Sequence, residues 1–218
     1  MASYVVRASI SNGSDSLETW ALELRSMVVS LLRQSFKRNA AMEAHFSTLA
    51  SQLRRVRLPK CYALSDEGMT EIVKKLPLLE ELDISFTNLS EDALEAIGRC
   101  CPRLKTLKYN TPVDTYVYDR EAFAIAKTMP QLRYLEIGGN KLSNHGLRAI
   151  LYGCPLLEYI DLRHCYKLDL SGSLGKMLRE KIKEIRLPLN LGSNGPLFDL
   201  KAYMESELEH ACQSYEFL

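Results

Sequence analysis

His164 and Cys165 are the neighbouring residues of this sequence whose types could support nucleophilic catalysis. A histidine beside a cysteine can take the thiol proton and leave the more reactive thiolate. Both residues, however, follow a short apolar segment after which the chain is expected to turn. We therefore expect a buried Cys165 sulfur and an outward His164, and an enzyme that uses His164 or Cys165 stays open as the least favoured functional alternative. The sequence also lacks a glycine-rich phosphate loop, His-Glu-x-x-His and Gly-x-Ser-x-Gly, so we predict no catalytic residues and no cofactor.

Cysteines are the other reactive group, and their even number raises the question of disulfides or a metal. Residues 1–13 have no apolar core of the length that a secretory signal needs, so we expect a reducing compartment, cytoplasmic or nuclear. No pair of Cys-x-x-Cys clusters occurs, and we predict no metal site. We expect free, mostly buried thiols at Cys61, Cys100, Cys101, Cys154, Cys165 and Cys212.

Charge and hydropathy narrow the class of protein further. The 218 residues include 28 Lys and Arg and 27 Asp and Glu, a net charge of +1. Dedicated nucleic-acid-binding proteins usually carry a strong basic excess, so we expect no nucleic-acid partner. The longest mostly apolar run, Met27 to Leu32, is far too short to span a bilayer, and we expect no membrane partner.

An apolar pattern, Leu-x-x-Leu-x-Leu, recurs six times. Its first positions are separated by 26, 25, 28, 25 and 25 residues, which indicates structural repeats. Asn or Cys stands eight residues after the first position in four of six repeats, as in leucine-rich repeats. The first positions are Leu53, Leu79, Leu104, Leu132, Leu157 and Ile182, and the slots are Cys61, Thr87, Pro112, Asn140, Cys165 and Asn190. Backbone amides are expected to point inward at this turn, so we expect the slot to hold either a compact acceptor or a small apolar side chain. Pro112 cannot accept in this way and is expected to distort the third repeat.

Residues at helical spacing follow these apolar segments. Ser65, Ser90 and Ser143 are expected N-caps, because their hydroxyls can accept from free amides of a first turn. Prolines come after the helices, where a missing N–H does no harm; they are Pro77, Pro102, Pro130 and Pro155. One strand and one helix per repeat predict an α/β leucine-rich-repeat solenoid, with about six repeats and a curved parallel sheet.

The two ends differ from the repeats and are expected to cap them. One amphipathic helix is expected over residues 16–38, and the helical half of a degenerate repeat over 39–52. A second amphipathic helix is expected after Pro196. We divide the chain into an N-terminal helical cap (1–52), a repeat array (53–190) and a C-terminal capping helix and tail (191–218).

The segment from Leu53 to Pro188 resembles the cysteine-containing leucine-rich repeats of plant F-box proteins. The resemblance is carried by Cys61 to Gly68, Leu79 to Ser85, Ala93 to Pro102, Gly153 to Pro155 and Leu157 to Cys165. It implies a non-catalytic module that recognises protein substrates for a Skp–cullin–F-box ubiquitin ligase.

The first 52 residues depart from the F-box pattern. They lack the Leu-Pro that typically opens an F-box, and Trp20 is followed by Ala-Leu-Glu instead of basic residues. We therefore expect no direct binding of the ligase adaptor by this chain alone. A second hypothesis stays open, in which the repeats act as an adaptor or scaffold outside any ligase.

The concave face of the predicted sheet offers rows of side chains to a protein partner. Side chains alternate along a strand, so residues between core positions point outward. Tyr134 and Tyr159 are the large aromatics of these rows, with Glu136, Asp161 and Arg163 close by. Exposed aromatics beside an arginine are typical of interface hot spots, while alternating charges could equally neutralise one another.

The long third repeat offers a competing surface. Its extra residues fall in the segment 110–120, where Tyr116 and Tyr118 accompany two valines. A loop this apolar either folds back on the array or binds something. The sequence therefore predicts a protein partner on the concave face or on the 110–120 loop.

Overall fold

The structure, a computed structural model, describes residues 7–9, 52–111, 119–139 and 142–187. The helices expected over 16–38 and after Pro196, the loop residues Tyr116 and Tyr118, and the distortion expected at Pro112 lie outside the described residues. The division of the chain into two caps and an array therefore stays a prediction.

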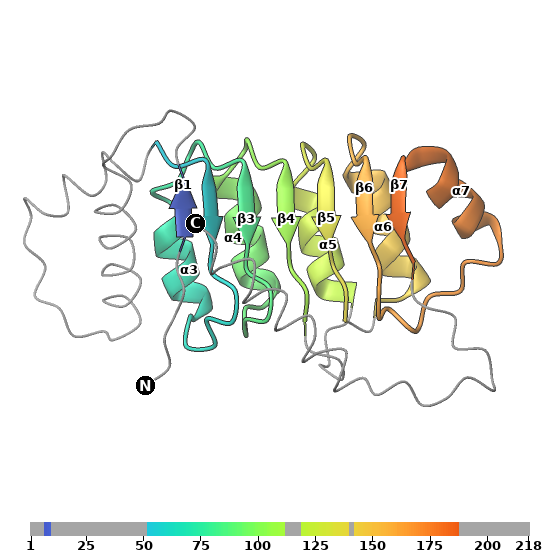
Figure 1. Ribbon diagram of the computed structural model, residues 1–218, viewed down its shortest axis with the longest axis horizontal. Coiled ribbons are helices and arrows are strands. Elements are labelled where there is room, and N and C mark those ends of the chain that lie inside the picture. The colour runs from blue at the N-terminus through green and yellow to red at the C-terminus, as the bar shows by residue number, and fades with distance from the viewer. Residues whose placement is uncertain (1–6, 10–51, 112–118, 140–141, 188–218) are drawn as a thin grey trace, which may run out of the picture. The chain divides into compact units, whose positions relative to one another are not determined.

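Among the described residues, seven short strands form one sheet, in the order in which they occur in the chain (Figure 1). Strands β2 to β7 are parallel and pair in register with their neighbours. Their bounds are β2 (Arg55–Arg57), β3 (Glu81–Asp83), β4 (Thr106–Lys108), β5 (Tyr134–Glu136), β6 (Tyr159–Asp161) and β7 (Glu184–Arg186). All six coincide with the repeated apolar pattern. Strand β1 (Arg7–Ser9) pairs antiparallel with β2, and the sequence analysis does not predict it.

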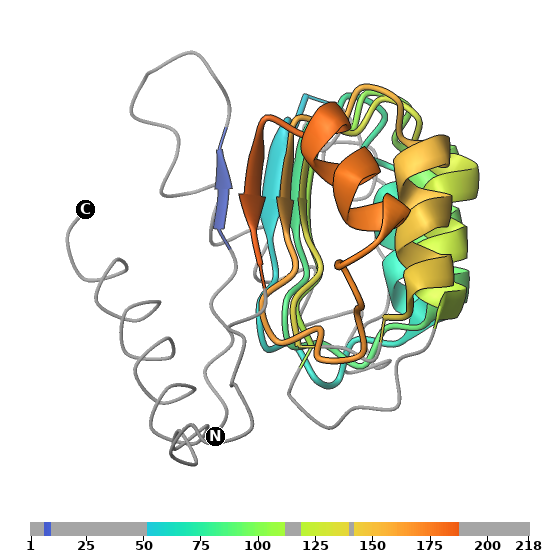
Figure 2. The ribbon, with the colours of Figure 1, turned by 90° about the vertical axis from the view of Figure 1, so that its right-hand side faces the viewer.

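The five described helices all lie on one side of the sheet (Figure 2). They are α3 (Asp66–Val73), α4 (Glu91–Cys100), α5 (Asp119–Thr128), α6 (Asn144–Gly153) and α7 (Ser173–Lys181). The middle residues of β2 to β6 are almost fully buried in a continuous apolar core; they are Val56, Leu82, Leu107, Leu135 and Ile160. Because neighbouring repeats share this core, the fold-class prediction of an α/β leucine-rich-repeat solenoid is confirmed for the described repeats.

Serine N-caps begin three of the helices, as predicted. The Oγ atoms of Ser65, Ser90 and Ser143 accept hydrogen bonds from backbone amides in the first turns of α3, α4 and α6. Two of these serines are also held by the preceding repeat. Ser90 donates its N–H and its hydroxyl to the Asp66 carboxylate at 2.9 and 2.6 Å, and Ser143 donates both to Asp119 at the same distances.

Asn144 extends this series to the next repeat. Its side chain donates to the Asp169 carbonyl at 3.0 Å and accepts from the Asp169 N–H at 2.9 Å. We call the three contacts Asp66–Ser90, Asp119–Ser143 and Asn144–Asp169 the inter-repeat clips. In each clip, the first residue of one helix holds the segment that leads into a later helix.

A backbone turn with positive φ follows the strand in four repeats. Lys60, Phe86 and His164 adopt φ of 59°, 59° and 66°, and Gly139 adopts 80°. Each lies seven residues after the first position of its repeat. A Cβ at Gly139 would lie 2.0 Å from the Thr111 carbonyl oxygen, so this position needs glycine for space as well as for its left-handed backbone.

The slot after this turn is buried in the repeats that the structure describes there. Cys61 and Cys165 are fully buried, and Thr87 nearly so. The expectation of an acceptor is wrong for Thr87, which donates. Cys61 and Cys165 are small buried side chains, the other kind that was expected in this slot. Thr87 Oγ1 donates to the Ile84 carbonyl at 2.8 Å, and Cys165 Sγ to the Ile137 carbonyl at 3.3 Å. A sharp turn leaves carbonyls as well as amides without ladder partners, so a small donor fits the slot.

Candidate protein-interaction surface

The side of the sheet that faces away from the five helices is the candidate surface, here called the strand face (Figure 2). In-register pairing gives it two rows, as predicted from the sequence. The first row holds Arg57, Asp83, Lys108, Glu136, Asp161 and Arg186. The second row holds Arg55, Glu81, Thr106, Tyr134, Tyr159 and Glu184.

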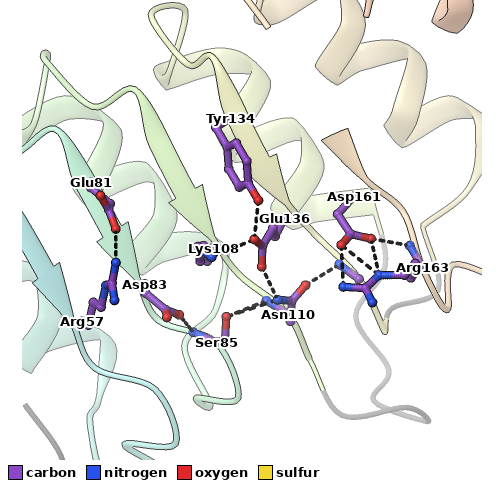
Figure 3. A network of polar contacts seen from close by, with 11 residues as sticks. Arg57, Glu81, Asp83, Ser85, Lys108, Asn110, Tyr134, Glu136, Asp161 and Arg163 are labelled. Carbon is purple, nitrogen blue, oxygen red and sulfur yellow. Dashed lines mark hydrogen bonds and ion pairs between the residues drawn. The ribbon is translucent and has the colours of Figure 1, made fainter. Parts of the chain in front are cut away.

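Many charges of the strand face form ion pairs with one another (Figure 3). Arg57 contacts Glu81 at 2.9 Å and Lys108 contacts Glu136 at 2.8 Å, each pair joining adjacent strands. Arg163 instead contacts Asp161, two residues earlier in its own repeat, at 2.8 Å. The charged rows therefore neutralise much of their own charge, partly across strands and partly within one repeat.

Glu136 is the centre of the polar network in Figure 3. Its carboxylate contacts Lys108 Nζ at 2.8 Å and accepts from Asn110 Nδ2 at 3.1 Å and from the Tyr134 hydroxyl at 2.7 Å. Burial alone would raise the pKa of Glu136, but the hydrogen bonds from Lys108, Tyr134 and Asn110 outweigh it and hold this pKa below its ordinary value. Asn110 in turn accepts from the Gly138 N–H at 2.9 Å, which ties β4 to the turn after β5.

Two aspartates of the first row are buried and held by the backbone that follows them. Asp161 accepts from the Arg163 N–H at 3.0 Å and from its guanidinium, and Asp83 accepts from the Ser85 N–H at 3.0 Å. Burial raises the pKa of Asp83, and the hydrogen bonds from Ser85 offset only part of the rise. Both carboxylates therefore fix the turns after their strands, and they lie beneath the outer surface.

Tyr134 and Tyr159 are brought together as predicted. Their rings stack with centroids 3.9 Å apart and an interplanar angle of 3°. Lys108 Nζ lies 5.6 Å from the Tyr134 centroid and Arg186 Cζ lies 5.8 Å from that of Tyr159, so a cation stands near each ring. The expectation that both rings are exposed is wrong for Tyr159, which is 7% exposed. Tyr134 is partly exposed and is the ring that a partner can reach.

Ser85 and Asn110 are network residues to which the sequence analysis assigns no role. Both occupy the position that Arg163 takes in its own repeat, two residues after the last strand position of the row. Ser85 Oγ accepts from Asn110 Nδ2 at 3.4 Å. The shared repeat position was the available signal, since a candidate contact residue in a row marks its neighbours as part of the same surface.

The Cys165–His164 pair does not present a nucleophile to solvent. Cys165 is fully buried and its thiol donates to a backbone carbonyl, while His164 Nδ1 lies 2.7 Å from the Tyr166 hydroxyl. Burial raises the pKa of Cys61 to about 11, and raises that of Cys101 and of Cys154 to about 12. Thiols with such pKa values are weak nucleophiles at neutral pH.

Cys61, Cys100, Cys101 and Cys154 are free thiols, and Cys100 is the one of the five described cysteines that is only partly buried. Within the described ranges, no cluster of three His, Cys, Asp or Glu side chains could hold a metal ion. None of the helices that the structure describes is long and apolar enough to cross a membrane.

The repeat, the slot residues and the one-sided helices define a leucine-rich-repeat protein of the cysteine-containing kind. The chain is similar in sequence to F-box/LRR-repeat proteins of Arabidopsis thaliana. F-box/LRR-repeat protein 23 is 46% identical over 143 residues, and F-box protein SKIP19 is 45% identical over 139 residues; each match covers 64% of this chain. F-box/LRR-repeat protein 22 is 38% identical over 181 residues, or 77% of this chain.

This chain spans only part of those relatives, namely 32%, 45% and 58% of their lengths in the same order. No family model matches the sequence. Among solved structures, the tropomodulin C-terminal domain from Caenorhabditis elegans aligns with 88% of this chain and 95% of its own, at 12% identity and a TM-score of 0.40. The fold assignment rests instead on the observed repeats and on the leucine-rich-repeat relatives.

Proposed function

We propose that the repeat array is a protein-recognition module that selects substrates in an F-box-type ubiquitin-ligase pathway. The observation that carries this proposal is the 38–46% identity of 139 to 181 residues of this chain to plant proteins that bear F-box names. The strand face supports it physically, because a sheet presents side chains in fixed positions and so lowers the entropy lost on binding.

The proposed contact residues on the strand face are Tyr134, Tyr159, Glu136, Asp161 and Arg163. Tyr134 is the proposed anchor, because it is the outer ring of the stack and because Glu136 and Tyr159 fix its orientation. Glu136, Asp161 and Tyr159 are less exposed, and their proposed role is mainly to hold in place the more exposed side chains that contact the partner. Tyr116 and Tyr118 of the 110–120 loop form the competing surface.

A second candidate function is that of an adaptor or scaffold outside any ligase. It is favoured by residues 1–52, which contain no Leu-Pro and no basic segment after Trp20. Affinity purification of the tagged chain from plant tissue separates the two functions. Co-purification of adaptor and cullin supports the ligase pathway, and a stable partner complex without either supports the scaffold. If robust one-to-one binding to purified adaptor occurs, the expectation of no direct adaptor contact is wrong.

The contact surface is tested with the protein captured in that purification. We expect Tyr134→Ala to weaken its binding about 30-fold, because a truncated aromatic anchor typically costs ~2 kcal/mol. The control is the double variant Tyr116→Ala with Tyr118→Ala, which leaves the strand face unchanged. Loss of binding in the loop variant, with full binding by Tyr134→Ala, would assign recognition to the loop.

A further inference from the structure

Acidic and basic side chains of the strand face lie at different depths. The side chains of Asp161, Glu136 and Glu81 are 3%, 13% and 18% exposed. Their basic partners are much more accessible, with Arg57 at 42%, Arg163 at 31% and Lys108 at 30%. Arg55, which contacts Glu81 from the side, is 62% exposed. A molecule that approaches the strand face therefore meets basic groups first.

The layering follows from side-chain length and from the anchoring of the carboxylates. Backbone N–H groups of the turns hold the carboxylates of Asp83 and Asp161 close to the sheet by hydrogen bonds. The side chains of Tyr134 and Asn110 hold the carboxylate of Glu136 in the same way. Arg and Lys have longer stems that lie along the surface and keep the charged head in water. Burial thus hides the negative half of each pair and leaves the positive half outside.

The two rows, with Arg163, contain as many acids as bases, so net charge does not reveal this layering. The bases are Arg55, Arg57, Lys108, Arg163 and Arg186, and the acids are Glu81, Asp83, Glu136, Asp161 and Glu184. Of these five acids, Glu184 on the last strand is the one that is exposed. Exposed cations can still bind an anion, because a guanidinium has several N–H donors and can contact a second carboxylate while it keeps the first.

The outward cations recur at every second strand. Arg57 ends β2, Lys108 ends β4 and Arg163 follows β6. Adjacent strands are ~4.8 Å apart, which spaces these cations by about 10 Å across the sheet. A polyproline II segment rises ~3.1 Å per residue with three residues per turn, so every third side chain recurs on one side at about 9.3 Å. An extended segment with an acid at every third residue matches the spacing.

We propose that the strand face binds an acidic, extended segment of a partner protein, running across the strands with its carboxylates on Arg57, Lys108 and Arg163. This inference rests on the proposed function, because it assigns the chemistry of the partner that the array recognises. A nucleic acid is the less favoured occupant, since the chain has a net charge of only +1 and carboxylates lie directly below these cations.

The test uses the full chain and two fluorescent peptides, (Glu-Pro-Pro)5 and (Gln-Pro-Pro)5, in an anisotropy titration at low salt. We expect the glutamate peptide to bind at least tenfold more tightly, with an affinity that falls as salt rises. A (dT)15 oligonucleotide serves as the third probe. Equal binding of the two peptides, or tighter binding of the oligonucleotide than of the glutamate peptide, would overturn the proposal.

Matched variants locate the binding site. The face variant carries Arg57→Gln, Lys108→Gln and Arg163→Gln, and the control variant carries Arg148→Gln, Lys176→Gln and Arg179→Gln on the exposed sides of α6 and α7. Both remove three positive charges. We expect the face variant to lose at least tenfold in affinity for the glutamate peptide and the control variant to lose less than twofold. Equal losses of affinity in the two variants would mean that net charge alone drives binding, and would contradict the proposal.

A third variant covers the chance that the face variant folds poorly with unpaired buried carboxylates. It removes both members of two pairs, with Lys108→Gln, Glu136→Gln, Arg163→Gln and Asp161→Asn, so net charge is unchanged. We expect this variant to lose at least tenfold in affinity for the glutamate peptide, because two of the three outward cations are gone. Unchanged affinity would contradict the proposal. If a captured partner depends on Tyr134 while the peptides bind equally, the inference fails and the proposed function stands. If the peptide result holds and no partner protein is captured, the proposed function fails instead.

Discussion

Tyr134 and Tyr159 stack at 3.9 Å between centroids, yet their hydroxyls have opposite environments. The Tyr134 hydroxyl donates to Glu136 at 2.7 Å. The Tyr159 hydroxyl is buried and has no hydrogen-bond partner among the described residues. The pair therefore combines one ring that is fixed by a charged acceptor with one ring that serves as its apolar base.

This difference predicts opposite outcomes for two phenylalanine substitutions. Tyr134→Phe should lower the free energy of unfolding by about 1.5–3 kcal/mol, because it removes a hydrogen bond to a charged group. Tyr159→Phe should be neutral or slightly stabilising, since it removes a buried polar atom that lacks a partner. Urea unfolding of the two variants beside the unchanged protein measures both values. Equal destabilisation by both would contradict the assigned environments.

Glu136 should make stability depend on pH. Its pKa is lower in the folded protein than its ordinary value. Its contribution to stability is therefore fully present above the ordinary pKa and is lost as pH falls through the lower, folded pKa. We expect Glu136→Gln to be less stable than the unchanged protein at pH 7, by about 2 kcal/mol, and the difference to shrink in acid. Thermal unfolding from pH 7 to pH 3 tests this, and a gap that widens toward low pH would reverse the sign.

The Asp119–Ser143 clip should make Ser143 more important than an ordinary N-cap. Ser143→Ala loses the cap to the His145 N–H and the hydroxyl bond to Asp119. We expect a loss of about 2–3 kcal/mol, the sum of a cap and a hydrogen bond to a charged group. Ser65→Ala, which loses the cap to the Gly68 N–H, is the control and should cost about 1 kcal/mol. Equal values from chemical denaturation would show that the clip adds nothing.

Strand β1 should protect the edge of the sheet. It pairs with β2 at Arg7–Arg57, Ala8–Val56 and Ser9–Arg55, and its removal leaves the outer edge of β2 without that partner. Unpaired edges promote association. We expect deletion of residues 1–40 to cause aggregation, and deletion of residues 1–6, which keeps β1, to leave a monomer. Light scattering after size-exclusion chromatography measures both, and a monomeric 1–40 deletion would refute this role.

Thiol labelling should distinguish Cys100 from the buried cysteines. At pH 8, Cys61, Cys101 and Cys154 are shielded and have raised pKa values, so iodoacetamide should modify them only after unfolding. Cys100 is partly exposed and should react in the native protein. Peptide mass spectrometry over time gives each rate. Rapid native labelling of Cys165 would reopen the hypothesis of a Cys–His enzyme.

The parallel strands were predictable because the repeat period carries their register. The repeat spacing alone predicts that Leu82, Leu107 and Leu135 are neighbours on adjacent strands, and the observed pairing joins these residues. Strand β1 was not predictable in the same way. It has three residues, Arg7–Ser9, and no apolar alternation, and its pairing depends on the edge of β2, whose residues lie 46 to 50 positions later in the chain.

The candidate surface was predictable in its rows and not in its depth. Register placed Tyr134 beside Tyr159, but burial of Tyr159 depends on the ring stacked against it and on Arg186 near it. Likewise, alternating signs suggested pairs across strands, whereas Arg163 reaches Asp161 of its own repeat. The exposed fraction of a side chain and its ion-pair partner depend on side-chain rotamers, which the order of residue types along the chain does not specify.

The inter-repeat clips also have a direction. In each clip, a side chain that comes earlier in the chain holds the start of a segment that comes later, as Asp66 does for Ser90 and Asn144 for Asp169. Starting a helix is the costly step of its formation, and a cap already held by a neighbour lowers that cost. Ribosomes release a chain from its N-terminus at ~5–20 residues per second. A repeat that carries a clip is thus a template for the segment that emerges next, and we expect the clipped repeats to form in chain order during synthesis.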